Sequence, residues 1–216
     1  ALKCPSVKSF INVTSDKVYE NKSWEWGYRE NERLNGSDPY SNSKSCADLI
    51  ANCYRHSFLE GKFNLSNVRS GNVIGGGDWA KDRLIPDMIR TIISKEEMTI
   101  RNPQSTRPWQ HVLEPLLGYI MLAQKMYNSD DFNSDWNFGP DHFEDASVEE
   151  IARRYSKYWS RNVAVSPKID TFKEAKYLRL DSSKASTRLG WHSLWDLDET
   201  LKKTFFWYEE FLNGSD

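Results

Sequence analysis

Two groups of residues near the start of the chain have side chains suited to moving protons. Tyr40 and Lys44 form a Tyr-x-x-x-Lys pattern in a segment expected to be helical, which places both on one face of the helix. An ammonium group beside a phenol stabilises the phenolate, which could then accept a proton from a hydroxyl group. The pattern also arises by chance, so a purely structural role is the alternative.

The second group, Ser15, Asp16 and Lys17, directly follows an apolar segment. Ser15 could bind a substrate hydroxyl, Asp16 could protonate a leaving hydroxyl, and Lys17 could remove a proton from carbon. A lysine base must be neutral for part of the time, which requires burial or a neighbouring cation such as Lys44. The alternatives are a turn capped by Asp16 and a simple ion pair between Lys17 and Asp16.

Strands and helices alternate around these residues, which predicts an α/β fold. A less regular second half favours a smaller lobe packed against the sheet. Loops are expected at 17–37, 71–78 and 101–109. The strands are predicted at 10–14, 63–68, 98–100, 136–138 and 163–169. The helices are predicted at 40–59, 85–94, 111–127, 147–159, 182–189 and 197–212, the fourth opened by a capping box at Ser147 and Glu150.

Composition excludes several classes of protein. The 216 residues include 29 Lys and Arg against 31 Asp and Glu, a net charge of −2 that argues against a nucleic-acid binder. No apolar run is long enough to span a membrane, and residues 1–9 do not resemble a secretory signal. The three cysteines form neither a disulfide framework nor a metal cluster. We therefore expect no bound metal and a cytoplasmic location.

The two groups, taken together with their spacing, resemble a known family. An apolar strand followed by Thr-Ser-Asp-Lys-Val-Tyr, and then Asp-Pro-Tyr-Ser-x-Ser-Lys, is similar to the extended short-chain dehydrogenase/reductase (NAD-dependent epimerase/dehydratase) family. The resemblance implies the C-terminal part of a Rossmann-type doubly wound parallel sheet with a smaller α/β substrate-binding lobe. Residues 1–80 would form the remaining part of the Rossmann domain, and 81–216 would form mainly the nucleotide-sugar lobe.

Three further segments, 68–79, 82–87 and 107–116, resemble the branch of CDP-glucose 4,6-dehydratases. The implied reaction starts with Tyr40, helped by Lys44 and Ser15, deprotonating the C4 hydroxyl while NAD takes the C4 hydride. Lys17 would then remove the C5 proton while Asp16 protonates the departing C6 hydroxyl. Return of the hydride to C6 gives CDP-4-keto-6-deoxyglucose, a deoxysugar precursor for surface polysaccharide such as O-antigen. Simple 4-epimerases of the family usually lack the Asp-Lys pair.

The same resemblance implies the residues that bind cofactor and substrate. Tyr40, Lys44, Ser70 and Gly71 would contact NAD. Arginines suit diphosphate oxygens, although a surface ion pair is the alternative for each. The implied substrate contacts are Asn72, Trp79, Arg83, Leu84, Arg107, Tyr177 and Arg179, with either Tyr177 or Arg179 reaching the diphosphate.

Family members begin with a strand, a Gly-rich turn and a helix that hold the NAD pyrophosphate, and no such motif occurs in this sequence. We therefore expect the chain to correspond to the back half of the sheet plus the substrate lobe, with strand 10–14 as an edge. Alone, it should be poorly stable and bind NAD weakly. A homodimer through helix 41–59 is expected of the complete enzyme. The alternatives are a non-catalytic nucleotide-sugar-binding remnant, or another nucleotide-sugar epimerase or dehydratase.

Overall fold

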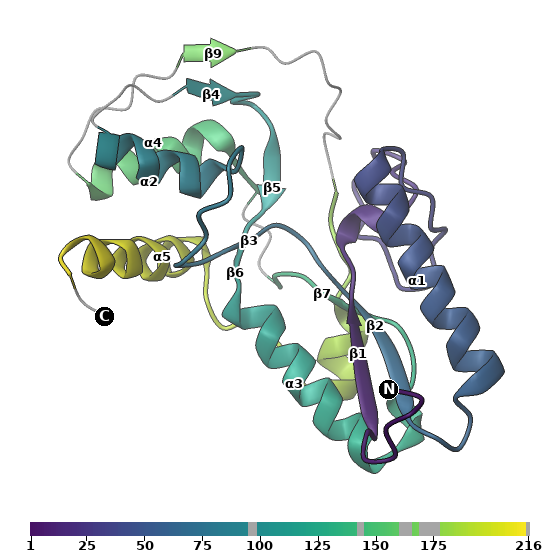
Figure 1. The fold of residues 1–216 in the computed structure, drawn as a ribbon. Coiled ribbons are helices and arrows are strands. Elements are labelled where there is room, and N and C mark those ends of the chain that lie inside the picture. The colour runs from purple at the N-terminus through teal and green to yellow at the C-terminus, as the bar shows by residue number, and fades with distance from the viewer. Residues whose placement is uncertain (95–98, 142–144, 160–165, 169–177, 215–216) are drawn as a thin grey trace. The chain divides into compact units, whose positions relative to one another are not determined.

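The computed structural model describes residues 1–94, 99–141, 145–159, 166–168 and 178–214 (Figure 1). The chain forms two compact units and passes between them several times. The first unit comprises Ala1–Gly71, Leu113–Asp141 and Leu178–Leu194. The second comprises Asn72–Val112, His142–Tyr177 and Trp195–Asp216.

The first unit is built on a parallel sheet of three strands. The strands β1 (Ser9–Val13), β2 (Asn64–Ser70) and β7 (Trp136–Phe138) lie in the order β1-β2-β7. In register, Val13 lies opposite Val68, and Val68 lies opposite Trp136. The two long helices are α1 (Pro39–Phe58) and α3 (Leu113–Asn128), and the short helices are η1 (Asp16–Val18), η2 (Asp130–Phe132) and η3 (Ala185–Leu189).

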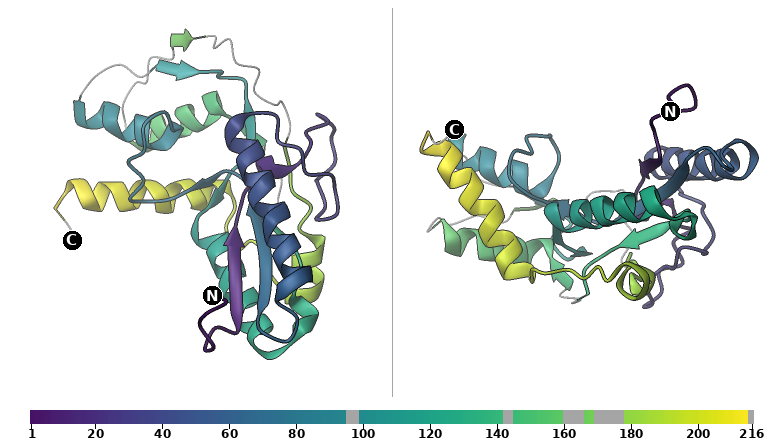
Figure 2. Two further views of the ribbon diagram at one scale, coloured as in Figure 1. Left: turned by 45° about the vertical axis from the view of Figure 1, so that its right-hand side comes forward. Right: turned by 90° about the horizontal axis from the view of Figure 1, so that it is seen from below.

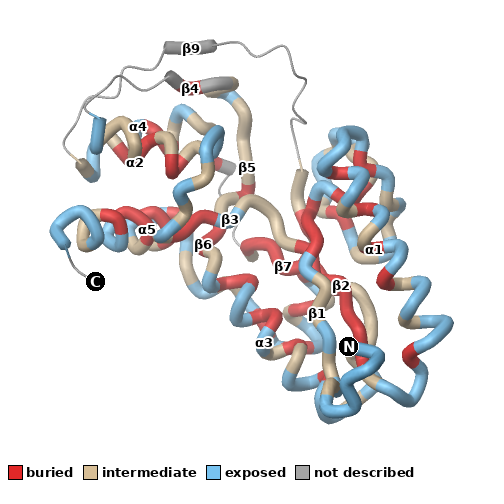
Figure 3. The backbone as a smooth tube through the Cα atoms, viewed as in Figure 1, coloured by how far each residue is buried: buried red, intermediate tan, exposed pale blue. Residues whose placement is uncertain are grey.

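The two long helices cover opposite faces of this sheet, because successive side chains of a strand point to opposite sides. On one side of β2, Leu65 packs with Ala51 of α1, and Arg69 bonds Asp48 of the same helix. On the other side, Val68 packs with Leu122 of α3. Figures 1 and 2 show β1 and β2 between the two helices, and Figure 3 shows that β2 is buried along most of its length.

Strand β1 lies at the edge of the sheet that the described residues form. Two of its apolar side chains face solvent, with Phe10 42% exposed and Val13 50% exposed. The expectation that this strand is an edge is therefore confirmed for this part of the chain. An apolar edge of this kind favours pairing with another strand.

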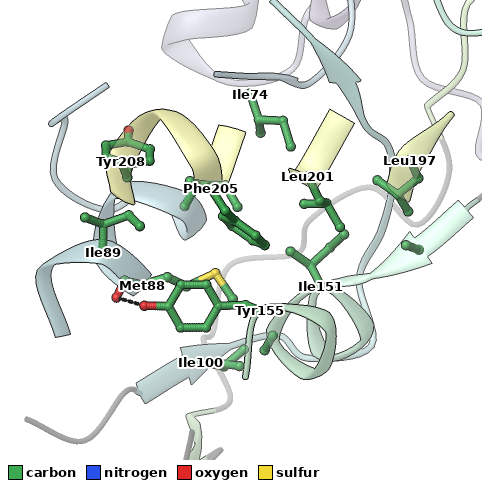
Figure 4. Close-up of a cluster of buried hydrophobic side chains, with 13 residues drawn as sticks. Ile74, Met88, Ile89, Ile100, Ile151, Tyr155, Leu197, Leu201, Phe205 and Tyr208 are labelled. Atoms are coloured by element: carbon green, nitrogen blue, oxygen red, sulfur yellow. Dashed lines mark hydrogen bonds between the residues drawn. The ribbon is translucent and has the colours of Figure 1, made fainter. Parts of the chain in front are cut away.

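The second unit packs three helices around one apolar core (Figure 4). These are α2 (Leu84–Ser94), α4 (Val148–Tyr158) and α5 (Leu197–Leu212). Tyr155 is buried among Ile89, Ile151 and Phe205, and its hydroxyl donates a hydrogen bond to the carbonyl of Met88. The short strands pair as β3 (Val73–Ile74) with β6 (Gln110–His111), β4 (Thr99–Arg101) with β9 (Ser166–Lys168), and β5 (Thr106–Pro108) with β8 (Asp145–Ser147).

Most predicted elements are confirmed, and the last helix is predicted with its observed bounds. The loop predictions are wrong in three places, because 71–78 contains β3, 101–109 contains β4's last residue and β5, and 17–37 begins inside η1. The short helix predicted at 182–189 contains a π-helical turn at 185–189. Parts of the strands predicted at 98–100 and 163–169 lie outside the described residues. No helix among the described residues is long and apolar enough to cross a membrane.

Candidate functional site

The first unit brings most of the predicted catalytic residues to one edge of its sheet. Ser15, Asp16 and Lys17 follow β1, and Ser70 and Gly71 lie at the end of β2. The two strands are parallel neighbours, so their carboxyl ends meet at the same edge. This edge is where open α/β sheets bind ligands.

Ser15 organises the short helix that carries the proposed acid and base. Its hydroxyl accepts a hydrogen bond from the backbone N–H of Lys17 at 3.2 Å and donates one to Asp16 Oδ1 at 2.9 Å. The carboxyl group of Asp16 belongs to a buried residue, whereas Lys17 is exposed. The described residues therefore do not bury Lys17.

Tyr40 meets Lys17 although the two belong to different elements. The Lys17 ammonium lies 6.0 Å from the centroid of the Tyr40 ring. Tyr40 is 53% exposed, so its phenol is open to a ligand. Lys44 follows one turn later on the same face of α1 and is half-buried. The Tyr40 phenol thus lies beside a lysine that follows β1, with Lys44 one turn further along α1.

Asp38 fixes the first turn of α1, on which Tyr40 lies. Its carboxylate accepts hydrogen bonds from the backbone N–H groups of Tyr40 and Ser41, both at 3.0 Å, and from the Ser41 hydroxyl. These bonds from Ser41, with the nearby Lys17 ammonium, hold the pKa of Asp38 below its usual value. The sequence signal for this cap was the Asp-Pro pair, since aspartate is favoured at the N-cap and proline in the first turn.

A buried ionic network holds the ends of the two strands and α1 together. Arg69 donates to both carboxylate oxygens of Asp48, at 2.9 and 2.7 Å, to Asp135 at 3.0 Å and to the Tyr19 hydroxyl at 2.7 Å. Thr14, the residue before Ser15, donates to Asp48 at 2.9 Å. We call Arg69, Asp48, Asp135, Tyr19 and Thr14 the Arg69 network. Sequence reasoning missed it, because the predicted strand 63–68 ended one residue before Arg69, whereas β2 extends to Ser70.

The network shifts the titration of its members. Burial raises the pKa of Tyr19 well above its usual value, despite the adjacent Arg69 guanidinium. Burial also acts to raise the pKa of Asp135, but the guanidinium groups of Arg69 and Arg55 outweigh it and hold that pKa below its usual value. The phenol is therefore neutral, and the carboxylate is charged, at neutral pH.

Ser70 is held from the opposite face of the sheet. The Tyr119 hydroxyl of α3 donates to Ser70 Oγ at 3.0 Å. Burial raises the pKa of Tyr119, which keeps this donor protonated. Ser70 and Gly71 are both half-buried, so the end of β2 remains partly open to a ligand.

Most predicted substrate contacts lie in the second unit. Arg83 is exposed and pairs with Asp78 at 2.9 Å, which is the surface ion pair weighed as the alternative for it. Arg107 is half-buried on β5, and its guanidinium donates to the carbonyl of Thr106 at 2.7 Å. Trp79 is partly exposed and packs edge-on against Tyr208.

The remaining predicted contacts lie in different places. Asn72 is half-buried and its carbonyl accepts from the backbone N–H of Gln110 at 3.1 Å. Leu84 begins α2. Arg179 lies in the first unit, with its carbonyl accepting from the backbone N–H of Tyr28 at 2.8 Å. Tyr177 lies outside the described residues. The described residues thus place the predicted catalytic residues in the first unit, and both their roles and the substrate contacts stay predictions.

A parallel sheet with helices on both faces and polar side chains at its carboxyl edge belongs to the Rossmann type of α/β fold. Within that class, the chain belongs to the family described as GDP-mannose 4,6 dehydratase, whose family model matches residues 2–204.

Solved structures agree on the fold. A dTDP-glucose 4,6-dehydratase from Bacillus anthracis, in complex with NAD, has a TM-score of 0.81 at 19% identity, covering 98% of this chain and 65% of that one. A UDP-glucuronic acid 4-epimerase from Bacillus cereus has a TM-score of 0.82 at 20% identity, covering 97% of this chain and 65% of that one.

A curated relative is much more similar in sequence. The CDP-glucose 4,6-dehydratase of Salmonella typhimurium is 48% identical over 219 aligned residues, which cover 98% of this chain. The chain spans 61% of that relative's length.

Proposed function

We propose that this chain carries the catalytic residues and the nucleotide-sugar contacts of a CDP-glucose 4,6-dehydratase. The observation that supports this most strongly is the 48% identity to the Salmonella typhimurium enzyme of that name across 98% of the chain. The Asp16-Lys17 pair at the carboxyl edge adds chemical support, because dehydration needs an acid and a base besides the residues that oxidise C4.

The described residues fit the nicotinamide end of NAD. The sheet edge offers the half-buried Ser70 and Gly71 at the end of β2, and the exposed Tyr40 phenol with Lys44 on α1. When bound, NAD supplies the acceptor for the hydride that leaves C4 and the donor of the hydride that reaches C6. The other chemical tasks fall to the side chains of this chain.

In the oxidation step, Tyr40 takes the proton of the C4 hydroxyl as the C4–H bond breaks. The Lys44 ammonium stabilises the phenolate, and the Ser15 hydroxyl binds the same sugar oxygen. The resulting C4 ketone acidifies the proton on C5.

In the elimination step, Lys17 takes the C5 proton while Asp16 protonates the C6 oxygen, which leaves as water. Lys17 returns its proton to C5 when hydride adds to C6. Tyr40 releases to solvent the proton it took from the C4 hydroxyl, and Asp16 regains one from solvent, so protons and electrons balance over the cycle. The 6.0 Å separation between the Lys17 ammonium and the Tyr40 ring supports this assignment, because the two bases must reach adjacent carbons of one sugar ring.

Substrate binding, assembly and location complete the proposal. The CDP-glucose contacts are those implied by the resemblance, with Arg107 and Arg83 on the diphosphate. For the complete enzyme we propose a homodimer through α1, whose outer face exposes Leu49, Ile50, Tyr54 and Phe58. The three cysteines are free and exposed, which suits the reducing cytoplasm.

The test is turnover of four nucleotide sugars by the purified protein. Purified protein is incubated with NAD⁺ and either CDP-, UDP-, dTDP- or GDP-glucose, and the products are weighed by mass spectrometry. We expect CDP-glucose to be converted fastest, to a product lighter by one water, with Tyr40→Phe as the inactive control. Faster conversion of another nucleotide would refute the assignment of cytidine. A product of unchanged mass with inverted C4 would instead identify an epimerase.

A further inference from the structure

Near Tyr40, the face of α1 that packs against the rest of the first unit is polar rather than apolar. Its buried residues there are Ser41, Ser45 and Asp48. A helix normally docks through an apolar stripe. Ser45 and Asp48 are hydrogen-bonded to residues outside α1, whereas Ser41 bonds Asp38 at the helix's own N-cap. The docking of this end of α1 therefore depends on directional contacts, which fix geometry more strictly than apolar packing does.

Ser45 makes the contacts that join α1 to the short helix η1. It is 3% exposed, and it directly follows Lys44 in the sequence. Its hydroxyl hydrogen is shared between the carbonyl of Val18, at 2.8 Å, and the carbonyl of Ser41, at 3.0 Å. Val18 directly follows Lys17, and Ser45 directly follows Lys44. The Ser45 hydroxyl therefore joins the backbone next to Lys17 to the helix that carries Lys44.

The same hydroxyl also holds the loop that leads into α1. The backbone N–H of Gly36 donates to Ser45 Oγ at 3.0 Å, and the Asn42 side chain donates to the Gly36 carbonyl at 3.0 Å. Only glycine fits at position 36, because a Cβ there would lie 2.3 Å from the Ser41 carbonyl carbon. The loop is thus attached to α1 on both sides of Gly36.

We propose that Ser45 is a positioning residue that sets the separation between Lys17 and Tyr40. The proposal rests on the proposed function, in which these two side chains act on adjacent carbons. In this scheme the Ser45 hydroxyl does not contact the substrate, and neither do the backbone groups of Val18 and Gly36 that it binds. Its effect on the reaction comes only through the placement of η1 against α1.

The fold offers a way to separate positioning from folding. The Arg69 network ties α1 to β1 and β2 independently, through Asp48 and its bonds to Thr14 and Arg69. Loss of the Ser45 hydroxyl should therefore leave the helix docked on the sheet while η1 and the Gly36 loop loosen. We expect Ser45→Ala to fold.

The experiment compares Ser45→Ala and Ser45→Thr with Ser57→Ala in the complete protein. Ser57 lies on the last turn of the same helix and is exposed, so its substitution is a matched control. Amide hydrogen exchange is measured on peptides covering 15–19 and 34–38, and steady-state kinetics are measured with CDP-glucose. We expect Ser45→Ala to exchange faster in both peptides and to lose kcat by about 10- to 100-fold with KM changed little, since a misplacement near 1 Å can cost this much. Ser45→Thr, which keeps the hydroxyl, should recover most of both.

The hydrogen-exchange readout and the kinetic readout can each contradict a different claim. Unchanged exchange in Ser45→Ala would overturn the positioning role, as would faster exchange with undiminished kcat. Absence of turnover in the wild-type protein would overturn the proposed function, whereas the exchange comparison would still decide whether Ser45 holds η1 and the Gly36 loop.

Discussion

Replacing Arg69 by methionine should destabilise the first unit far more than replacing a surface arginine. The Arg69 side chain is 1% exposed and that of Asp48 is 0% exposed. Without the guanidinium, the Asp48 carboxylate keeps the Thr14 hydroxyl as a donor but loses its bidentate partner. Leaving a buried charge without its partner costs about 3–5 kcal/mol.

Arg29→Met is the matched control, because it also removes an arginine that pairs with an aspartate. The Arg29 side chain is 72% exposed and lies 3.3 Å from Asp181. Water screens this pair, so its loss should cost about 0–1 kcal/mol. Both variants are unfolded in urea and followed by circular dichroism, and the free energies of unfolding are compared with that of the wild type.

A double-mutant cycle shows whether the cost belongs to the pair. If Asp48 is destabilised by the loss of Arg69, then Arg69→Met combined with Asp48→Asn should cost less than the two single changes added together, by about 0.5–3 kcal/mol. A loss of 1 kcal/mol or less for Arg69→Met, equal to that of the control, would refute the reasoning about the buried charge.

Three further outcomes are expected. Lys17→Met should retain C4 oxidation, measured as NADH absorbance, but should stop the loss of water; dehydration at the wild-type rate would exclude Lys17 as the base. Asp135 has a lowered pKa in the folded state, so its charge stabilises the fold above the unfolded value of about 3.9 and that contribution is lost as pH falls below it. Asp135→Asn should therefore flatten the pH dependence of the unfolding free energy below about pH 4, whereas an unchanged slope would count against the assignment. Leu122→Ala should cost about 2–5 kcal/mol in urea unfolding because Leu122 is fully buried, and the exposed Ile120→Ala on the same helix should cost under about 0.5 kcal/mol; equal losses would contradict the packing described.

Periodicity predicted the long helices because each needs only local information. The last helix was predicted as 197–212 from its amphipathic pattern, and Asp196 caps it by accepting from the backbone N–H of Glu199 at 2.8 Å. Strands β3 and β5 were missed inside predicted loops, since they are too short to show a period, whereas the three-residue β7 was predicted with its observed bounds. Strand β5 exists because it pairs with β8, which lies about 40 residues further along the chain.

The sequence pointed to the candidate catalytic residues but not to the contacts that hold them in place. Ser15 and Tyr40 could be recognised by type and spacing, and the structure places their elements at one sheet edge. The bonds of Arg69 could not be foreseen, because its partners Asp48 and Asp135 come from separate elements and only the fold brings them together. The proposed role of Ser45 could not be foreseen either, because it depends on a hydrogen bond to the carbonyl of Val18, which belongs to a different element.

The most direct test of the proposed function follows one hydrogen atom through the reaction. The complete protein is given NAD⁺ and CDP-glucose carrying deuterium at C4, and the product is examined by mass spectrometry and NMR. We predict a product that has lost one unlabelled water and carries the deuterium at C6, because the hydride removed from C4 is returned to C6 within the same turnover. Recovery of the deuterium at C4, or loss of the label without dehydration, would contradict the proposal that this chain belongs to a CDP-glucose 4,6-dehydratase.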